Sequence, residues 1–176
     1  KETLRKLIKT RKSEHSKEQL LNYSTEILKL LCFEPVWAQA EVVLLYYSLP
    51  DEVYTHAFIE RWCKYKKIIL PVVVGDELEL RVFTGSQDLV QGSFNILEPS
   101  GELFLDYDAI DLVIVHGVAF DICNNRLGRG KGFYDKLLPK IKAYKLGICF
   151  PFQFFKSKTI PVAEYDIPMD KILTQK

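Results

Sequence analysis

The sequence predicts an α/β fold, with a mostly parallel sheet between layers of helices. Continuous apolar runs such as residues 42–48 and 68–74 are typical of strands buried on both faces, as in parallel sheets. Segments with apolar residues at helical spacing alternate with these runs. A chain of 176 residues without repeats or linkers suits one domain. We therefore expect residues 1–176 to form a single Rossmann-like, three-layer unit with a β-hairpin excursion.

The first forty residues predict two helices. A short first helix carries apolar side chains at helical spacing, namely Leu4, Leu7 and Ile8. Ser16 and Gln19 form a capping-box pattern at the start of a second helix. That helix is long, because one face continues through Leu20, Ser24, Ile27, Leu28 and Leu31.

The middle of the chain predicts two strands, a helix and a hairpin. Residues 42–48 form the first buried strand, and Thr55 can cap the next helix, whose inner face is Phe58, Ile59 and Trp62. Residues 68–74 form the second strand. Gly75 and Asp76 are a turn signal, and an alternating apolar pattern follows at Leu78, Leu80 and Val82.

The last third of the chain predicts two more strands, with a loop and a helix between them. Residues 111–115 form a strand, residues 134–141 a helix that Pro139 shortens or kinks, and residues 146–150 another strand. Ligands of such sheets bind beyond the carboxyl ends of the strands. Residues 47–52, 116–132 and the segment from Pro151 onward could therefore converge on one edge.

Composition and cysteine spacing exclude several classes. A net charge of +1 gives no reason to expect nucleic acid or a membrane as a partner. The N-terminal segment lacks the apolar core of a signal peptide, and the longest apolar run, residues 42–47, is too short to span a bilayer. No C-x-x-C pair occurs among the four cysteines, which disfavours zinc and fits a reduced, cytoplasmic setting. We expect a monomer.

The most distinctive segment is a glycine-rich loop with cations between the glycines. It reads Arg126-Leu127-Gly128-Arg129-Gly130-Lys131-Gly132-Phe133-Tyr134-Asp135. Backbone N–H groups of such a loop form a concave anion site, and a polyphosphate with Mg²⁺ on Asp135 is its natural ligand. The spacing is neither that of a Walker A loop nor G-x-G-x-x-G. A plain helix-capping loop is the alternative for the glycines alone.

A longer pattern extends this loop in both directions. Gly117 and Ala119-Phe120-Asp121 precede it, and further matches lie at residues 1–5, 46–55, 67–71, 95–99 and 165–170. Together they resemble, over the whole chain, the 5-formyltetrahydrofolate cyclo-ligase family, whose signature is roughly P-G-x-A-F-D followed by R-L-G-x-G-x-G-Y-Y-D. Two residues depart from that signature: His116 replaces the usual Pro, and Phe133 replaces the first Tyr and loses a hydroxyl.

The resemblance implies a ligase dependent on ATP and Mg²⁺. Its substrate would be 5-formyltetrahydrofolate, free or polyglutamylated, and its products 5,10-methenyltetrahydrofolate, ADP and phosphate, formed by phosphoryl activation of the formyl oxygen. It assigns catalysis to Lys131 and Arg129, and the metal to Asp135 and Asp166. The implied ATP site is Lys1, Arg5, Arg126, Gly128, Arg129, Gly130, Lys131, Gly132, Phe133 and Tyr134. The implied folate site is Arg5, Tyr47, Glu52, Arg129 and Phe133.

Several of these positions keep a second interpretation. Asp51 competes with Glu52 as the pterin carboxylate, and Asp170 or Glu164 could replace Asp166. Asp135 also suits the first turn of a helix, where the dipole favours an acid. Arg126 could instead form a structural pair with Asp121. Lys1 and Arg5 could belong to a solvated helix face, and Tyr47 could pack in the core.

Two further functions remain open at this point. A sugar-phosphate isomerase or acyl-transfer enzyme on a similar sheet would use the loop for a monophosphate. A non-catalytic nucleotide-binding module would carry a degraded site. The presence of Lys131, Asp135 and Glu52 argues against degradation.

Overall fold

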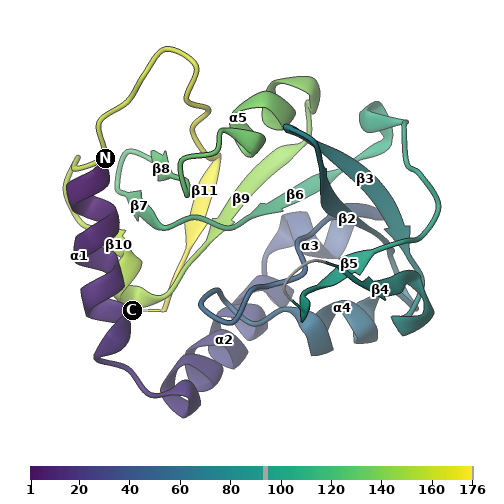
Figure 1. Ribbon diagram of the computed structural model, residues 1–176, viewed down its shortest axis with the longest axis horizontal. Helices are drawn as coiled ribbons and strands as arrows, with labels where there is room; N and C mark the ends of the chain where they lie inside the picture. Colours follow the sequence, from purple (N-terminus) through teal and green to yellow (C-terminus); the bar gives the residue numbers. More distant parts are fainter. Residues whose placement is uncertain (93–94, 176) are drawn as a thin grey trace.

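A six-stranded sheet forms the centre of the protein in the computed structural model, which describes residues 1–92 and 95–175 (Figure 1). Its strand order is β11-β9-β6-β1-β2-β3. Neighbouring strands are parallel except for the β2–β3 hairpin. The predicted α/β class, with a mostly parallel sheet and a hairpin, is confirmed. The strands are β1 (Val42–Leu44), β2 (Lys67–Val74), β3 (Glu77–Phe83), β6 (Leu112–Val115), β9 (Tyr144–Ile148) and β11 (Lys171–Leu173).

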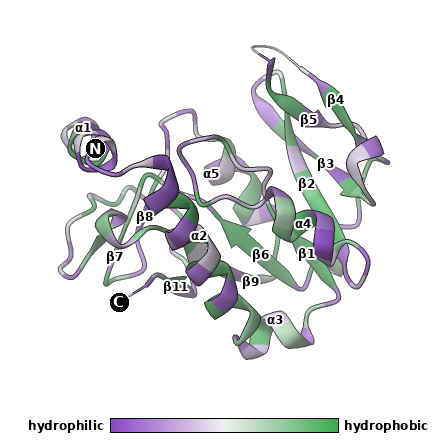
Figure 2. Cartoon of the chain, turned by 90° about the horizontal axis from the view of Figure 1, so that it is seen from below, coloured by the Kyte–Doolittle hydropathy of each residue, from purple (hydrophilic) through white to green (hydrophobic). Residues whose placement is uncertain are grey.

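Helices cover both faces of this sheet, which gives the predicted three layers (Figure 2). One face carries α2 (Lys17–Cys32), α3 (Pro35–Gln39) and α4 (His56–Trp62). The other carries α5 (Phe133–Leu137) and a 3₁₀ turn, η4 (Leu138–Lys140). Successive strand residues point to opposite faces. Val43 therefore packs in the first layer and Leu44 in the second.

The first helix stands apart from these layers and packs on a second, smaller sheet. This helix, α1 (Glu2–Ser13), buries Ile8 against Ala119, Leu127 and Ile160. The small sheet has the order β10-β7-β8, with β7 (Ala119–Asp121), β8 (Arg126–Leu127) and β10 (Phe154–Phe155). The sequence predicted only a loop between residues 116 and 132. Figure 1 shows α1 beside β7 and β10, with the chain start close to the loop that precedes β11.

The interpretation of Arg126 as a structural partner of Asp121 is wrong. The Asp121 carboxylate accepts hydrogen bonds from the backbone N–H groups of Cys123 and Asn125, which close the β7–β8 turn. It also accepts from those of Thr159 and Ile160, which anchor the distant segment after β10. Burial acts to raise the pKa of Asp121, but these donors together lower it. Arg126 faces the other way and lies 3.4 Å from Asp135.

Several of the predicted element boundaries hold and others need correction, including the helix expected at 134–141, which ends at Leu137. The α2 capping box between Ser16 and Gln19 is present, and Pro139 ends α5 in the 3₁₀ turn. The strand expected at 42–48 ends at Leu44, and the strand expected at 146–150 begins at Tyr144. Thr55 precedes α4, but its hydroxyl donates to the Tyr46 carbonyl rather than capping the helix. Leu45 still donates to the Ile69 carbonyl of β2, whereas Tyr46 and Ser48 are bonded to Thr55.

Further short elements connect this framework. A two-stranded arm, β4 (Leu89–Gln91) and β5 (Leu97–Pro99), projects beyond the β2–β3 hairpin (Figure 2). The 3₁₀ turns are η1 (Ser86–Asp88), η3 (Tyr107–Ala109) and η5 (Pro151–Gln153). Within residues 1–92 and 95–175, no helix has the length and apolarity that a membrane crossing requires.

Candidate active site

A cleft of about 640 Å³ lies where the chain leaves the carboxyl ends of β1 and β6. Segments that are distant in sequence form its walls, among them α1, the turn after β1, the glycine loop and the tail before β11. Every site residue that the sequence predicted lines this cleft, namely Lys1, Arg5, Tyr47, Glu52, Arg126, Gly128, Arg129, Gly130, Lys131, Gly132, Phe133, Tyr134, Asp135 and Asp166. The expected convergence on one sheet edge is therefore confirmed.

The glycine loop presents Lys131 to the cleft. Gly130 and Gly132 have φ angles of 103° and 72°, in the left-handed region that glycine adopts without strain. Gly132 is also the N-cap of α5. The Lys131 side chain is exposed, and within residues 1–92 and 95–175 no hydrogen bond or ion pair engages its ammonium group. The charge is thus available to an anionic ligand.

The first helix reaches into the cleft through its two predicted ligand-binding cations. Arg5 Nε donates to the Gly128 carbonyl over 2.9 Å, and a side chain at Gly130 would meet the Arg5 guanidinium at 3.4 Å. Lys1 forms an ion pair with Asp166. Arg5 therefore faces the loop, whereas Lys1 pairs with Asp166 but remains exposed. Arg5 lies at ordinary contact distance from Gly130, where the positive φ angle is what favours glycine.

Of the two neighbouring acids, Asp51 and Glu52, only Glu52 lines the cleft, and its side chain is only 6% exposed. Its Oε2 accepts from the Leu49 backbone N–H, and its Oε1 from Arg129 Nη2, both over 2.9 Å. Asp51 lies outside the cleft lining and pairs with Lys12 and Arg129. Burial acts to raise the pKa of Asp51, but its hydrogen bond from Arg129 and the Lys12 charge lower it overall. The geometry favours Glu52 over Asp51 as the ligand-binding acid.

His116 is a cleft residue to which the sequence assigned no role. Its Nδ1 lies 3.1 Å from Glu52 Oε1. Its ring lies between Tyr46, at 4.8 Å, and the edge of Tyr134, at 5.0 Å between centroids. Burial lowers the pKa of His116 to about 4, although the nearby Glu52 charge opposes that shift. Its place directly after a buried strand, beside a glycine, was the signal that could have identified it.

The buried, neutral state of His116 predicts an acid-sensitive fold. Its pKa is about 6.5 in an unfolded chain and about 4 here, so the unfolded chain binds the proton more readily. This contribution to stability is complete above about pH 6.5 and is lost as pH falls towards 4. After a discount for the partial exposure of the ring, loss of this contribution should lower the free energy of unfolding by roughly 2 kcal/mol between pH 7 and 4.5. Urea unfolding at the two pH values should show a smaller loss of stability in His116→Asn than in the wild type. An equal loss in both proteins would contradict the prediction.

Two carboxylates beside the loop fit a magnesium ion. Asp135 lies 3.4 Å from Arg126, and Asp166 accepts from Lys1 and from the Ala163 N–H. Burial acts to raise the pKa of Asp166, but these donors lower it, so it is ionised. Mg²⁺ usually takes one or two carboxylates and completes its shell with phosphate and water. No group of three metal-binding side chains occurs in the part of the chain that the structure describes, and a shell of this kind asks the protein for only one or two carboxylates.

The alternative metal ligands are less well placed. Asp170 accepts from the Lys145 backbone N–H over 2.7 Å, at the amino end of β9, and does not line the cleft. Glu164 is also absent from the cleft lining. Asp166 therefore remains the better candidate.

Aromatic and apolar side chains form the remaining walls. Phe133 and Tyr134 come from the loop, whereas Pro71, Val73 and Leu97 come from the hairpin and arm. The Tyr134 hydroxyl is buried and has no hydrogen-bond partner among the described residues. Such an orphaned hydroxyl beside a cleft is available to a ligand.

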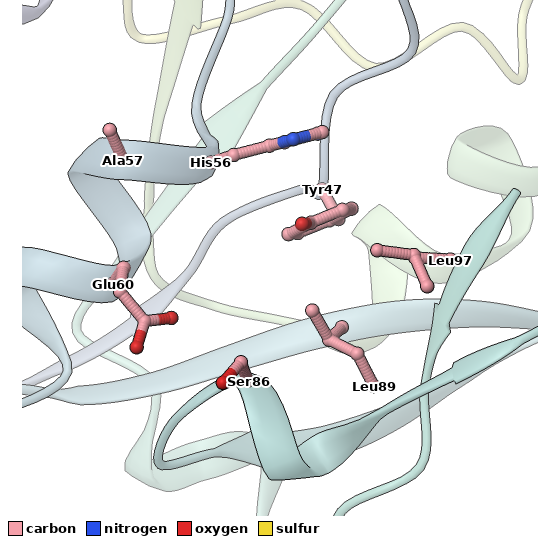
Figure 3. Close-up of a pocket in the computed structure, with 7 residues that line it drawn as sticks. All are labelled: Tyr47, His56, Ala57, Glu60, Ser86, Leu89 and Leu97. Atoms are coloured by element: carbon pink, nitrogen blue, oxygen red, sulfur yellow. The ribbon is translucent and has the colours of Figure 1, made fainter.

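A smaller pocket of about 340 Å³ adjoins the cleft and shares Tyr47 and Leu97 with it (Figure 3). Tyr47 stacks on His56 with ring centroids 3.7 Å apart, so Tyr47 forms a wall of both spaces. The alternative that Tyr47 packs in the core therefore describes only part of its surroundings, because the same side chain also lines the cleft. The other lining residues are Ala57, Glu60, Ser86 and Leu89, which include an acid but no Lys or Arg.

The fold and the cleft together define an α/β protein whose glycine-rich cationic loop lines a cleft at the edge of the sheet. The model of the 5-formyltetrahydrofolate cyclo-ligase family matches residues 1–175. The chain therefore belongs to the 5-formyltetrahydrofolate cyclo-ligase family, whose members are ligases of folate one-carbon metabolism.

Individual relatives agree with this assignment. A probable 5-formyltetrahydrofolate cyclo-ligase of Schizosaccharomyces pombe is 32% identical over 86% of this chain and 83% of its own. The Escherichia coli 5-formyltetrahydrofolate cyclo-ligase is also 32% identical, over 83% of this chain and 84% of its own. The solved structure of Aquifex aeolicus 5,10-methenyltetrahydrofolate synthetase superposes with a TM-score of 0.86, at 34% identity over 98% of this chain and 88% of that one.

Proposed function

We propose that this chain converts 5-formyltetrahydrofolate and ATP to 5,10-methenyltetrahydrofolate, ADP and phosphate through a phosphorylated formyl oxygen. A formamide oxygen is a poor leaving group. Transfer of the γ-phosphoryl group of ATP to that oxygen makes it a good one and leaves an electrophilic carbon. Nitrogen 10 of the same substrate then attacks this carbon, phosphate leaves with the C–O bond electrons, and the proton of nitrogen 10 is released.

The observation that supports this proposal is the meeting of a cationic glycine loop and a buried carboxylate in one cleft. We assign the nucleotide phosphates to the loop amides, Lys131 and Arg126. Preorganised cations stabilise the charge on a transferring phosphoryl group. We assign the pterin to Glu52, because a carboxylate can accept from the paired N–H donors of that ring. Arg5, Tyr47, Arg129 and Phe133 would complete the folate site.

Asp135 and Asp166 would hold Mg²⁺, which would neutralise phosphate charge when bound. We also propose that residues 1–176 act as one domain and as a monomer in the cytoplasm, where the four free thiols stay reduced. The folate would be accepted with one glutamate or several.

One assay tests the proposed reaction. Purified protein is incubated with 5-formyltetrahydrofolate and Mg²⁺-ATP, and methenyl absorbance in the near ultraviolet is followed. We expect ADP and methenyltetrahydrofolate to form in equal amounts. Omission of ATP is the control. ATP hydrolysis without methenyl product would contradict the proposal.

The metal assignment predicts the behaviour of Asp166→Asn. A hard cation binds a neutral amide less well than a carboxylate. The half-saturating Mg²⁺ concentration should therefore rise about tenfold or more, with a smaller change in folate affinity. Asp170→Asn is the matched control, because Asp170 holds a strand terminus away from the cleft. A shift in the control but not in Asp166→Asn would reverse the assignment.

A further inference from the structure

Tyr165 is a cleft residue to which the proposed reaction gives no role. It lies in the tail before β11, and it is 67% exposed. The other aromatic side chains that line the cleft are less exposed: Tyr46 and Tyr134 are buried, and Tyr47 and Phe133 are half-buried. An exposed ring on an open surface needs no function. This one lies in a cleft, where its face is accessible to a ligand.

The first helix shows at which end of the cleft this ring lies. Lys1, at the start of α1, pairs with Asp166 of the tail, and the chain start lies close to that tail (Figure 1). Lys12, near the end of α1, pairs with Asp51 of the turn after β1. The eleven positions from Lys1 to Lys12 correspond to roughly 16 Å along the helix axis, at about 1.5 Å each. The tail and the turn therefore meet the helix at opposite ends.

The glycine loop meets the helix between these two ends. Arg5, one turn after the start of the helix, donates through Nε to the Gly128 carbonyl over 2.9 Å. Tyr165 directly precedes the acid that pairs at the start of the helix, and Glu52 directly follows the acid that pairs near its end. Along the helix, the order is therefore Tyr165, the loop and Glu52.

This order determines where a nucleotide base can lie. The proposed reaction places the γ-phosphate on the loop, beside the formyl group of a folate whose pterin is assigned to Glu52. The folate then occupies the Glu52 side of the phosphates, and the nucleoside has to extend to the other side. Tyr165 is the exposed aromatic ring on that side. Nucleic-acid bases stack favourably on the faces of aromatic side chains.

We propose that Tyr165 is the stacking platform for the purine ring of the nucleotide. This inference rests on the proposed function and deepens it, because it assigns the base end of the nucleotide subsite. Stacking uses the face of the ring, so the Tyr165 hydroxyl is not required. Stacking also does not read the hydrogen-bonding edge of the base. Tyr165 therefore contributes affinity for a purine rather than selection of adenine over guanine.

The test separates the base from the phosphates. Calorimetry measures binding of a non-hydrolysable ATP analogue and of inorganic tripolyphosphate, which has no base, both with Mg²⁺. We expect Tyr165→Ala to weaken binding of the analogue about tenfold or more and to leave tripolyphosphate binding unchanged. Tyr165→Phe and Tyr165→Trp keep an aromatic face, so they should bind both ligands as the wild type does.

The controls distinguish stacking from a structural effect. Tyr65→Ala is the matched control, because Tyr65 is 74% exposed but lies outside the cleft lining, and it should bind the analogue as the wild type does. Thermal melts should be unchanged in both alanine variants. Equal losses for the analogue and tripolyphosphate, unchanged analogue binding in Tyr165→Ala, or a loss confined to 5-formyltetrahydrofolate would overturn the proposal. No methenyl product from a wild type that binds the analogue would overturn instead the function on which it rests.

Discussion

Lys131→Ala is expected to lower kcat about a hundredfold or more, the usual effect of removing one preorganised electrostatic stabiliser. The reason is geometric as well as electrostatic. Two glycines in the left-handed region hold the exposed ammonium over the cleft. The substitution should leave the free energy of unfolding nearly unchanged, because the side chain contributes no contact that packing requires.

The measurement is single-turnover formation of methenyltetrahydrofolate by wild type and variant. Lys136→Ala is the matched control: it removes a cation five positions further along, which pairs with Asp76 outside the cleft. The control should keep wild-type turnover. If Lys131→Ala also turned over at the wild-type rate, Lys131 would have no part in phosphoryl transfer.

Glu52→Gln is expected to weaken folate binding by about 1–3 kcal/mol, or roughly fivefold to 150-fold, while ATP binding changes little. The amide has one acceptor oxygen where the carboxylate has two. The Leu49 backbone N–H and the Arg129 guanidinium already supply donors to those two oxygens. The new amide N–H groups would therefore face donors of the protein or of the pterin.

Calorimetry with each ligand separately checks that Glu52→Gln weakens folate binding but not ATP binding. Asp51→Asn is the control, since Asp51 shares Arg129 with Glu52 but lies outside the cleft lining. Folate binding lost in Asp51→Asn and retained in Glu52→Gln would make Asp51 the pterin carboxylate. Equal losses for folate and ATP in Glu52→Gln would contradict the division of the cleft into two subsites.

Much of this architecture could be predicted because its signals are local. The capping box at Ser16 and the hairpin turn at Gly75 are short-range patterns, and both occur in the structure. The small β10-β7-β8 sheet could not be predicted in this way. Its strands have two or three residues, and the Asp121 carboxylate holds them through backbone groups of a segment almost forty residues later.

The candidate site shows the same division. The family resemblance, carried mainly by the glycine loop, implied the site residues, and all of them line one cleft. The pairing among those side chains depends on three-dimensional proximity alone. Neither the Arg126–Asp135 pair nor the contact of His116 with Glu52, more than sixty residues away, leaves a sequence pattern.

The bridge from Arg129 to Glu52 has a consequence for the order in which ligands add. One guanidinium connects the loop assigned to the nucleotide with the acid assigned to the folate. Any ligand that displaces Arg129 changes the affinity of the opposite subsite, and linkage requires the second ligand to alter the first by the same factor. Initial-rate patterns should therefore show interdependent Michaelis constants for the two substrates, with a sign set by whether Glu52 binds the pterin better with or without its arginine.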